Sequence, residues 1–275
     1  MEVIYLTHAT ELKDVEPHVM AIGFFDGVHL GHQALFKKTK KIAAELGVKS
    51  SALTFSPHPE EVIKGDVNKK YLTPLKEKIR KISECQLDKL YVMKFDKPFA
   101  SLPPTNFIDK YIGGMNVKHV VVGFDFTFGF KAAGDVDLLC KLSKEKEYEV
   151  TVVPKITYQN EKISSTLIRN LLAEGNVELI PYILGNHYQI KATLQTLGTA
   201  EDAFTVTMLD PYMLPKHGTY EVNIYENGHV HDGELVHAID GQMTLYAKDL
   251  KCRNVEQSIV FLSRLKVKET VLVSS

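Results

Sequence analysis

Two histidines, His29 and His32, stand three residues apart in the segment GFFDGVHLGHQALF, with Gly31 between them. An apolar run precedes the segment and a helical pattern follows it, so both histidines are expected in the first turn of a helix. Backbone N–H groups in that turn lack intrahelical partners, and the helix dipole attracts anions there. Gly31 carries no side chain, which allows an anion to come close to the backbone. The spacing therefore favours contact with a polyphosphate.

The same spacing supports two other interpretations. Histidines at positions i and i+3 share one helical face and could bind a metal ion together. In the simplest alternative, one histidine caps the helix and the other is merely exposed. No third histidine or cysteine lies nearby in the sequence, and we therefore favour phosphate.

Three further segments with polar side chains follow predicted strands. They are SPHP at residues 56–59, GFDFTFG at residues 123–129 and ISSTLIR at residues 163–169. In the last segment Ser164, Ser165 and Thr166 can cap a helix and donate hydroxyl groups, and Arg169 can reach the same anion from the next turn. Considered alone, this segment is more typical of an ordinary helix cap with a surface arginine. The carboxyl ends of parallel strands would bring all three segments toward the histidines.

The elements that would position these residues alternate along the chain from residue 19 to residue 153. The short β-rich runs are VMAIGF, SSALTF, KLYVMKF, HVVVG and EVTVV. The segments with helical patterns are Gln33–Leu46, Pro74–Cys85 with Thr73 as its cap, Thr105–Ile112 and Asp135–Lys144. This alternation predicts a parallel sheet covered by helices on both faces. A capped helix that stops near Gly175 and a shorter helical piece that reaches Leu184 are expected next.

The pattern changes after Gly185 to short alternating runs. These are FTVTML, TYEVNIY, ELVHAI and QMTLYA, separated by Asn227-Gly228, Asp232-Gly233 and Asp240-Gly241, dipeptides that favour two-residue hairpin turns. The runs predict an antiparallel barrel or sandwich of about ninety residues. We therefore expect an α/β domain over residues 1–184 and a smaller β domain over residues 185–275.

Within this region His229, His231 and Asp232 form the cluster HVHD. The two histidines share one face of a strand, so a two-ligand metal site is geometrically possible. The adjacent turn dipeptide instead favours solvent-facing turn residues.

Composition excludes several classes of function. The formal net charge is -1 and the longest cluster of like charge is KKTKK at residues 37–41, so no nucleic-acid partner is expected, although a small anionic ligand fits. Cys85, Cys140 and Cys252 lie far apart without CxxC spacing, which argues against a disulfide framework and a zinc site. The N-terminus has acids in place of an apolar signal, and no window approaches the roughly 18 apolar residues of a membrane span. A cytoplasmic protein without a membrane segment is expected.

The segment GFFDGVHLGHQALF resembles the G-x-F-D-G-x-H-x-G-H signature of the nucleotidyltransferase superfamily. With PHP, VGFDFTFG and ISSTLIR in the same order, residues 15–185 resemble the FMN adenylyltransferase module of bacterial FAD synthetases, the riboflavin kinase/FMN adenylyltransferase family. The resemblance implies a Rossmann-like nucleotidyltransferase domain. It also implies an enzyme that transfers AMP from ATP, with Mg²⁺, to FMN, giving FAD and pyrophosphate. ATP and FMN would be its small-molecule partners.

The resemblance also implies a role for each matching residue. The predicted catalytic residues are His29, His32, Ser164, Thr166 and Arg169. The predicted ATP-binding residues are Gly23, Phe24, Asp26, Gly31 and Ser165. The predicted flavin-binding residues are His58, Asp125, Phe126 and Phe128. The histidines would stabilise the transferring α-phosphoryl group, a reaction that needs positioning and charge neutralisation without an obligatory protein nucleophile. No magnesium ligand and no oligomeric state is assigned.

Two positions depart from the family pattern. Ser56 stands where the family often carries an acid, which weakens metal ligation there, and Thr127 stands where an arginine or lysine is frequent, which would loosen binding of the flavin phosphate. Phenylalanines alternate at positions 124, 126, 128 and 130. They could stack on an isoalloxazine ring, or they could pack a half-buried loop on the core.

The second domain resembles the riboflavin kinase barrel of the bifunctional family without its phosphate-binding loop. LGNHYQIKATL at residues 184–194 resembles the opening segment, and LPKHGTY at residues 214–220 resembles a later strand entry. The intervening QTLGTAEDAFTVTML contains no PTAN. We therefore expect FAD synthesis without riboflavin kinase activity. The alternatives are another HxGH nucleotidyltransferase, acting on a different phosphorylated acceptor, and a non-catalytic flavin or nucleotide sensor.

Overall fold

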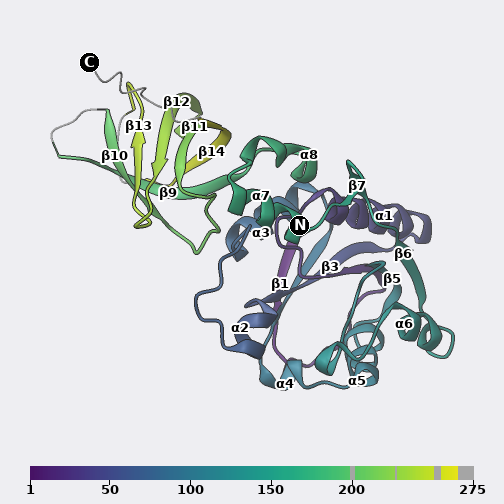
Figure 1. Cartoon of the computed structure of the whole chain (residues 1–275). Helices are drawn as coiled ribbons and strands as arrows, with labels where there is room; N and C mark the ends of the chain where they lie inside the picture. Colours follow the sequence, from purple (N-terminus) through teal and green to yellow (C-terminus); the bar gives the residue numbers. More distant parts are fainter. Residues whose placement is uncertain (199–201, 227, 251–254, 266–275) are drawn as a thin grey trace, which may run out of the picture. The chain divides into compact units, whose positions relative to one another are not determined.

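The structure is a computed structural model that describes residues 1–198, 202–226, 228–250 and 255–265. The chain divides into two compact units, whose elements are drawn in Figure 1. The first unit comprises residues 1–69 and 73–163, and the second comprises residues 70–72 together with the chain from Ser164 onward. The predicted fold, a parallel α/β sheet followed by an antiparallel barrel, is confirmed.

The first unit is built on a six-stranded sheet in which neighbouring strands are parallel. The strands are β1 Glu2–Leu6, β2 His18–Ile22, β3 Lys49–Ser56, β4 Lys89–Lys94, β5 Val117–Gly123 and β6 Glu149–Val153, in the spatial order β1-β4-β3-β2-β5-β6. All five predicted strands are present. The edge strand β1 was not predicted, because no helix separates it from β2 and the pair lacks the alternation on which the prediction relied.

The central strand β2 is buried at every residue. Met20 and Ile22 belong to one hydrophobic cluster, and Val19 and Ala21 belong to the other. Since successive side chains of a strand point to opposite faces, the two clusters cover the two faces of the sheet. A strand covered on both faces has a continuous apolar sequence, as VMAIGF does.

The helices of the first unit follow the prediction, with two additional short helices and one additional 3₁₀ turn. They are α1 Leu30–Leu46, α2 Pro59–Lys64, α3 Leu75–Glu84, α4 Lys97–Ala100, α5 Pro104–Ile108 with the π-helical turn η1 Asp109–Gly113, the 3₁₀ turn η2 Phe130–Ala132, and α6 Val136–Ser143. The short helices α2 and α4 were not predicted. A small hairpin, β7 Thr157–Tyr158 and β8 Glu161–Lys162, follows β6. The prediction that Thr73 caps α3 was wrong, because Pro74 precedes the helix and the Thr73 hydroxyl accepts from the Gly27 N–H at 2.8 Å.

The sheet order reverses next to β2. Strands β3 and β4 lie on one side of β2, and β5 and β6 lie on the other. In open α/β sheets, ligands bind outside the carboxyl ends of the strands at such a switch point. The chain leaves β2 at Gly23 and ends β5 at Gly123, so the segments GFFDGVHLGH and GFDFTFG begin at this place.

The second unit contains helical segments and a closed six-stranded barrel. The helical segments are α7 Ser165–Glu174, the 3₁₀ turn η3 Val177–Leu179 and α8 Pro181–Leu184. The strands are β9 Gln189–Thr196, β10 Ala203–Met208, β11 Gly218–Glu226, β12 His229–His237, β13 Met243–Tyr246 and β14 Gln257–Leu265, in the order β10-β13-β12-β11-β14-β9. Both predicted helical pieces are therefore present, and the β region is a barrel.

One predicted hairpin turn was wrong. Asp232-Gly233 lies inside β12, where Gly233 pairs with Val222 of β11. A Cβ at Gly233 would stand 2.9 Å from Ile224 Cδ1 and 2.9 Å from the Tyr246 carbonyl oxygen, so glycine is required for close packing and not for a turn. Asp240-Gly241 does form a turn, between β12 and β13, and Gly228 lies in the turn between β11 and β12, whereas Asn227 lies outside the described residues.

The HVHD cluster also lies in strand β12 and not in a turn. His229 is exposed, and the half-buried His231 has its Nε2 3.8 Å from a carboxylate oxygen of Glu226. Among the described residues there is no group of three His, Cys, Asp or Glu side chains that could hold a metal ion.

The division into compact units falls earlier than the predicted domain boundary between residues 184 and 185. Helix α7 groups with the barrel, because the Lys216 N–H donates to the Leu172 carbonyl at 2.7 Å and Arg264 donates to the Glu174 carbonyl at 3.0 Å. The boundary at residue 184 stays a prediction about where the family's two modules meet.

Two expectations from composition concern cysteines and membrane spans. Cys85 and Cys140 are free, half-buried thiols, and Cys252 lies outside the described residues. Within the ranges that the structure describes, no helix combines the length and the apolar character that crossing a membrane requires.

Candidate active site

The two histidines lie side by side at the start of α1. His29 is the N-cap residue, and its Nδ1 accepts a hydrogen bond from the backbone N–H of His32 at 3.3 Å. The two rings are stacked, with centroids 3.6 Å apart and planes 17° apart. His32 also packs edge-on against Phe25, with centroids 5.2 Å apart. One histidine thus caps the helix, as in the simplest alternative, but the second packs against its partner and is not merely exposed.

Both imidazoles are neutral at pH 7. Burial, with the charge of Lys162 as the next cause, lowers the pKa of His29 to about 4. Burial lowers the pKa of His32 well below 6.5, and the charges of His29, Lys78 and Lys162 act in the same direction. Because Nδ1 of His29 is an acceptor, the proton of the neutral ring belongs on Nε2, which can donate to an anionic oxygen. The Nδ1 of His32 is buried without a hydrogen-bond partner in the described part of the chain.

The loop before the histidines has a strained backbone, and hydrogen bonds hold it in shape. Phe25 and Val28 have positive φ angles of 58° and 49°, a conformation that costs non-glycine residues about 1–3 kcal/mol each and that clusters at functional sites. The buried carboxylate of Asp26 accepts from the Thr73 N–H at 3.0 Å, and Thr73 Oγ1 accepts from the Gly27 N–H at 2.8 Å. Asp26 therefore fixes the shape of the loop, whatever else it binds.

The two predicted glycines, Gly23 in the loop and Gly31 in the first turn of α1, make room for aromatic rings. A Cβ at Gly23 would lie 2.7 Å from the Phe25 ring, and a Cβ at Gly31 would lie 3.0 Å from the His29 ring. The expectation that Gly31 serves close approach of an anion stays a prediction; the structure shows that Gly31 first permits the packing of His29.

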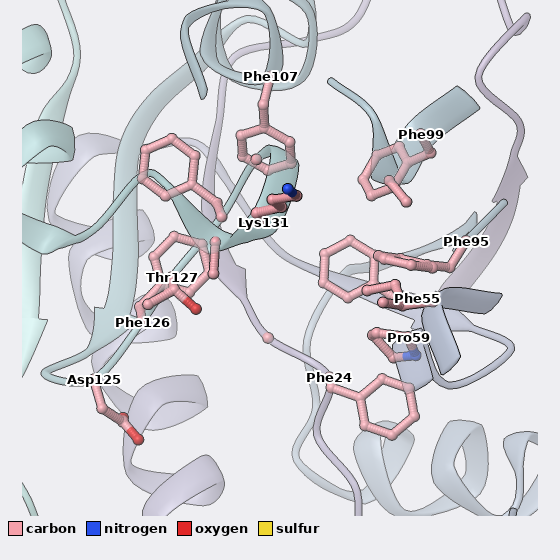
Figure 2. A pocket seen from close by; sticks show the side chains of 16 residues that line it. Phe24, Phe55, Pro59, Phe95, Phe99, Phe107, Asp125, Phe126, Thr127 and Lys131 are labelled. Carbon is pink, nitrogen blue, oxygen red and sulfur yellow. The ribbon is translucent and has the colours of Figure 1, made fainter. Parts of the chain in front are cut away.

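An aromatic cavity of about 410 Å³ opens at the same end of the sheet (Figure 2). Residues that line it are Gly23, Phe24, Phe55, Pro59, Ile63, Phe95, Phe99, Ala100, Phe107, Asp125, Phe126, Thr127, Phe128, Gly129, Lys131 and Ala132. Figure 2 shows Phe126 and Thr127 on one wall and Phe55 and Phe95 on the facing wall. Apolar, aromatic walls with a few polar groups at the rim are typical of a site for a flat aromatic ligand.

The four alternating phenylalanines divide between the two interpretations that the sequence left open. Phe126 and Phe128 line the cavity with their rings stacked, 5.5 Å apart and 16° from parallel. Phe128 also packs on Phe107, at 5.4 Å between centroids. Phe124 and Phe130 are exposed, at 42% and 47%. Only the middle two can therefore form a wall for a ring.

His58 and Asp125 stand near the cavity in different ways. His58 caps α2, since its Nδ1 accepts from the Glu60 N–H at 3.1 Å, and its ring packs edge-on against Phe24 at 4.4 Å. It thus supports a residue of the cavity without lining it. Asp125 lines the cavity and forms an ion pair with Lys162 of β8.

Three lysines around the histidines and the cavity were missed in the sequence. Lys131 lines the cavity, as Thr127 does, and has a left-handed backbone conformation with φ 54°. Lys162 could have been noticed because it directly precedes ISSTLIR. Lys78 gave no signal, because a lysine in a helix is ordinarily expected at the surface.

The remaining predicted residues belong to the second unit. Ser164 is the N-cap of α7, and its Oγ accepts from the Leu167 N–H at 3.2 Å. Ser165 and Thr166 open the helix, and Arg169, one turn on, has a guanidinium nitrogen 3.6 Å from the Met213 sulfur. The local prediction of a capped helix is confirmed, and the convergence of these residues with the histidines stays a prediction.

Comparison with known proteins decides the family. A sequence model of FAD synthetase matches residues 11–167. The chain belongs to the FAD synthetase family. A bifunctional riboflavin kinase/FMN adenylyltransferase of Listeria monocytogenes is 40% identical over 245 residues, which cover 85% of this chain and 76% of that protein. A second protein of the same organism, an FAD synthetase, is 34% identical over 90% of this chain and 98% of its own length.

One solved structure supports the fold independently. It is a Streptococcus pneumoniae protein titled as a macrolide-efflux protein, with a TM-score of 0.86 and 24% identity, and the match covers 98% of this chain and 94% of that one. At that identity the likeness shows the fold alone. Membership of the FAD synthetase family makes the chain an enzyme of the nucleotidyltransferase type with a Rossmann-like first unit.

Proposed function

We propose that the chain transfers AMP from ATP to FMN, giving FAD and pyrophosphate. The observation that carries the proposal is the pair of stacked, neutral imidazoles at the start of α1, next to an aromatic cavity in the same unit. Gly23 and Phe24 link the two features, because they line the cavity and open the loop that carries the histidines.

The chemistry is an in-line displacement at phosphorus. An oxygen of the FMN phosphate forms a bond to the α-phosphorus of ATP, and the bond from that phosphorus to the bridging oxygen of the β-phosphate breaks. No protein nucleophile is required, so the protein contributes positioning and charge stabilisation. His29 Nε2–H and the ring of His32 would donate to oxygens of the transferring phosphoryl group. Ser165, Thr166 and Arg169 would hold the β and γ phosphates as they leave, with Ser164 capping their helix.

Magnesium would arrive with the nucleotide. Mg²⁺ commonly keeps several waters and binds through substrate phosphates with one or two carboxylates. The described residues hold no group of three His, Cys, Asp or Glu side chains that could bind an ion. The ion would supply charge neutralisation on the triphosphate, and we assign no protein ligand to it.

The flavin ring would lie in the aromatic cavity. Phe126 and Phe128 would contact the ring, and Asp125 would stand at the rim, where it is paired with Lys162. His58 would act through Phe24. Asp26 and Gly31, predicted to bind ATP, would act by shaping the loop.

We further propose that the barrel has no riboflavin kinase activity. Residues 195–209, between the two segments that resemble the kinase module, contain no PTAN. The shorter Listeria relative, almost fully covered by this chain, is named an FAD synthetase without mention of a kinase. A cytoplasmic location, where ATP and FMN are available, and the absence of a nucleic-acid partner complete the proposal.

Product analysis tests both parts. Purified protein is incubated with MgATP and either FMN or riboflavin, and products are separated by chromatography. FAD from FMN, with riboflavin unchanged, is the expected result. FMN formed from riboflavin would contradict the proposal for the barrel. No FAD from FMN would contradict the adenylyl transfer and would direct attention to other phosphorylated acceptors or to a sensor.

A further inference from the structure

A buried lysine lies against the loop before the histidines. Lys78 of α3 is 1% exposed, and its Nζ donates a hydrogen bond of 2.8 Å to the Phe24 carbonyl oxygen. The same nitrogen lies 3.7 Å from the centroid of the Phe24 ring. Lysine is almost never fully buried unless it is paired, because desolvation of the ammonium group is costly. The burial of a charged lysine at this place therefore needs a physical explanation.

The charge of Lys78 reaches groups on two other elements. In the loop after β2, the charge of Asp26 supports the ammonium form, while burial acts more strongly and lowers the pKa of Lys78 to about 8. On α1, the charge of Lys78 is one of the causes that lower the pKa of His32. On β3, the uncharged Thr54 hydroxyl donates to the same Phe24 carbonyl at 2.9 Å. In the described part of the chain, Asp26 and His32 are thus titratable groups that interact with Lys78.

Phe24 connects Lys78 to the proposed flavin cavity and to the proposed nucleotide site. Its ring lines the aromatic cavity, and its carbonyl belongs to the loop that leads to His29. Lys162, which acts on both histidines, is more exposed than Lys78 and is already paired with Asp125. A buried charge is screened far less by solvent and salt than an exposed, paired one.

We propose that Lys78 is a positioning residue of the nucleotide site. Its buried positive charge strengthens binding of the triphosphate at His29 and His32, which follow the loop that Lys78 contacts. Its hydrogen bond and its contact with the Phe24 ring hold the cavity wall in place at the same time. The inference rests on the proposed function, and it supplies a source of positive charge that the two neutral imidazoles lack.

A change of pH separates the effect of the Lys78 charge on binding from the effect of its hydrogen bond. Lys78 is mostly an ammonium group at pH 7 and mostly a neutral amine at pH 9, and the neutral amine can still donate to the Phe24 carbonyl. Calorimetric titration of the full chain with MgATP, without FMN, measures the effect. We expect the affinity of the parent protein to fall about tenfold between pH 7 and pH 9, the size of one partly screened charge interaction.

Two variants and a matched control complete the test. Lys78→Met should bind MgATP as weakly at pH 7 as at pH 9, and Lys78→Arg, charged throughout, should show no fall between these pH values. Lys81→Met is the control, because Lys81 lies one turn further on the same helix, is 7% exposed, and has its pKa affected by Glu77, Arg80 and Glu84. It should keep the affinity and the pH dependence of the parent.

Different outcomes would contradict the role of Lys78 and the proposed adenylyl transfer. Equal affinity of the parent at pH 7 and pH 9, or an unchanged pH dependence in a folded Lys78→Met, would overturn the role of Lys78 even if FAD is formed. The expected pH response without FAD formation would overturn the proposed reaction and leave Lys78 in a nucleotide site. If Lys78→Met does not fold, the parent and Lys78→Arg still decide.

Discussion

Asp26 and His29, which follow β2, and Lys78 of α3 are buried, whereas strand β11 of the barrel buries Tyr220, Val222 and Ile224. Apolar burial of the second kind lowers the free energy of folding directly. Charged and titratable groups cost free energy on burial, and they persist where partners or function compensate. The difference teaches that the first unit gathers buried titratable groups around one loop, whereas the inward side chains of β11 are mainly apolar, with the buried carboxylate of Glu226 at its end.

The largest expected effect comes from removing an imidazole. His32→Ala should lower the rate of FAD formation by about 100-fold or more, because a positioned donor to the reacting phosphoryl group is lost. Binding of FMN, measured by the quenching of flavin fluorescence, should change little. His229→Ala, an exposed histidine on β12, is the matched control in the other unit and should keep the parent rate. Equal rates in the two variants would remove His32 from the mechanism.

A smaller effect is expected in the cavity. Phe126→Ala removes one wall and should raise the KM for FMN about fivefold, the equivalent of about 1 kcal/mol of aromatic contact. The KM for ATP should stay unchanged. Phe130→Ala is the control, because Phe130 belongs to the same alternating series but is 47% exposed and does not line the cavity. An identical rise in both variants would argue against a flavin in this cavity.

The acid side of the pH profile tests the neutral imidazoles. The pKa of His29 in the folded state is about 4, below the ordinary 6.5, so folding favours the neutral ring. The contribution of His29 to stability is complete above pH 6.5 and is lost as pH falls from 6.5 toward 4. Thermal unfolding should show this decline. A melting temperature that stays constant between pH 6.5 and pH 4 would mean that His29 keeps an ordinary pKa in the folded state.

The smallest effect on activity should come from the barrel. Gly233→Ala places a Cβ 2.9 Å from Ile224 Cδ1 and from the Tyr246 carbonyl oxygen and should destabilise the fold by about 1–3 kcal/mol. The melting temperature should fall by several degrees. The kcat for FAD formation at a temperature where the variant is folded should equal that of the parent. A large drop in kcat would show that the barrel contributes to catalysis beyond stability.

The features that could be predicted from the sequence were those that depend on a local pattern of residues. The apolar run VMAIGF and the helix after it placed His29 and His32 correctly, because strand burial and helix capping are local properties. Other features depend on distant packing. Lys78 is buried by contact with Phe24, 54 positions earlier, and Thr73 bonds with Asp26 and Gly27 instead of capping α3.

The cavity shows the same limit. Its walls come from Phe55, Phe95, Phe107 and Phe126, which lie on four separate segments and have no common spacing. In the barrel, Asp232-Gly233 has the composition of a turn, and only the closeness of Ile224 and Tyr246 reveals that the glycine serves strand packing. The sequence therefore predicted the residues that follow local patterns, and it did not predict the tertiary contacts around them.

The central claim is that AMP, and not the terminal phosphate, moves to the flavin. The most direct test supplies ATP labelled at the α-phosphorus or at the γ-phosphorus to the purified chain, with FMN or riboflavin as acceptor. The account predicts that the α label appears in FAD from FMN, that the γ label appears only in pyrophosphate, and that riboflavin acquires neither. Transfer of the γ label to either flavin, or failure of the α label to reach FAD, would contradict it.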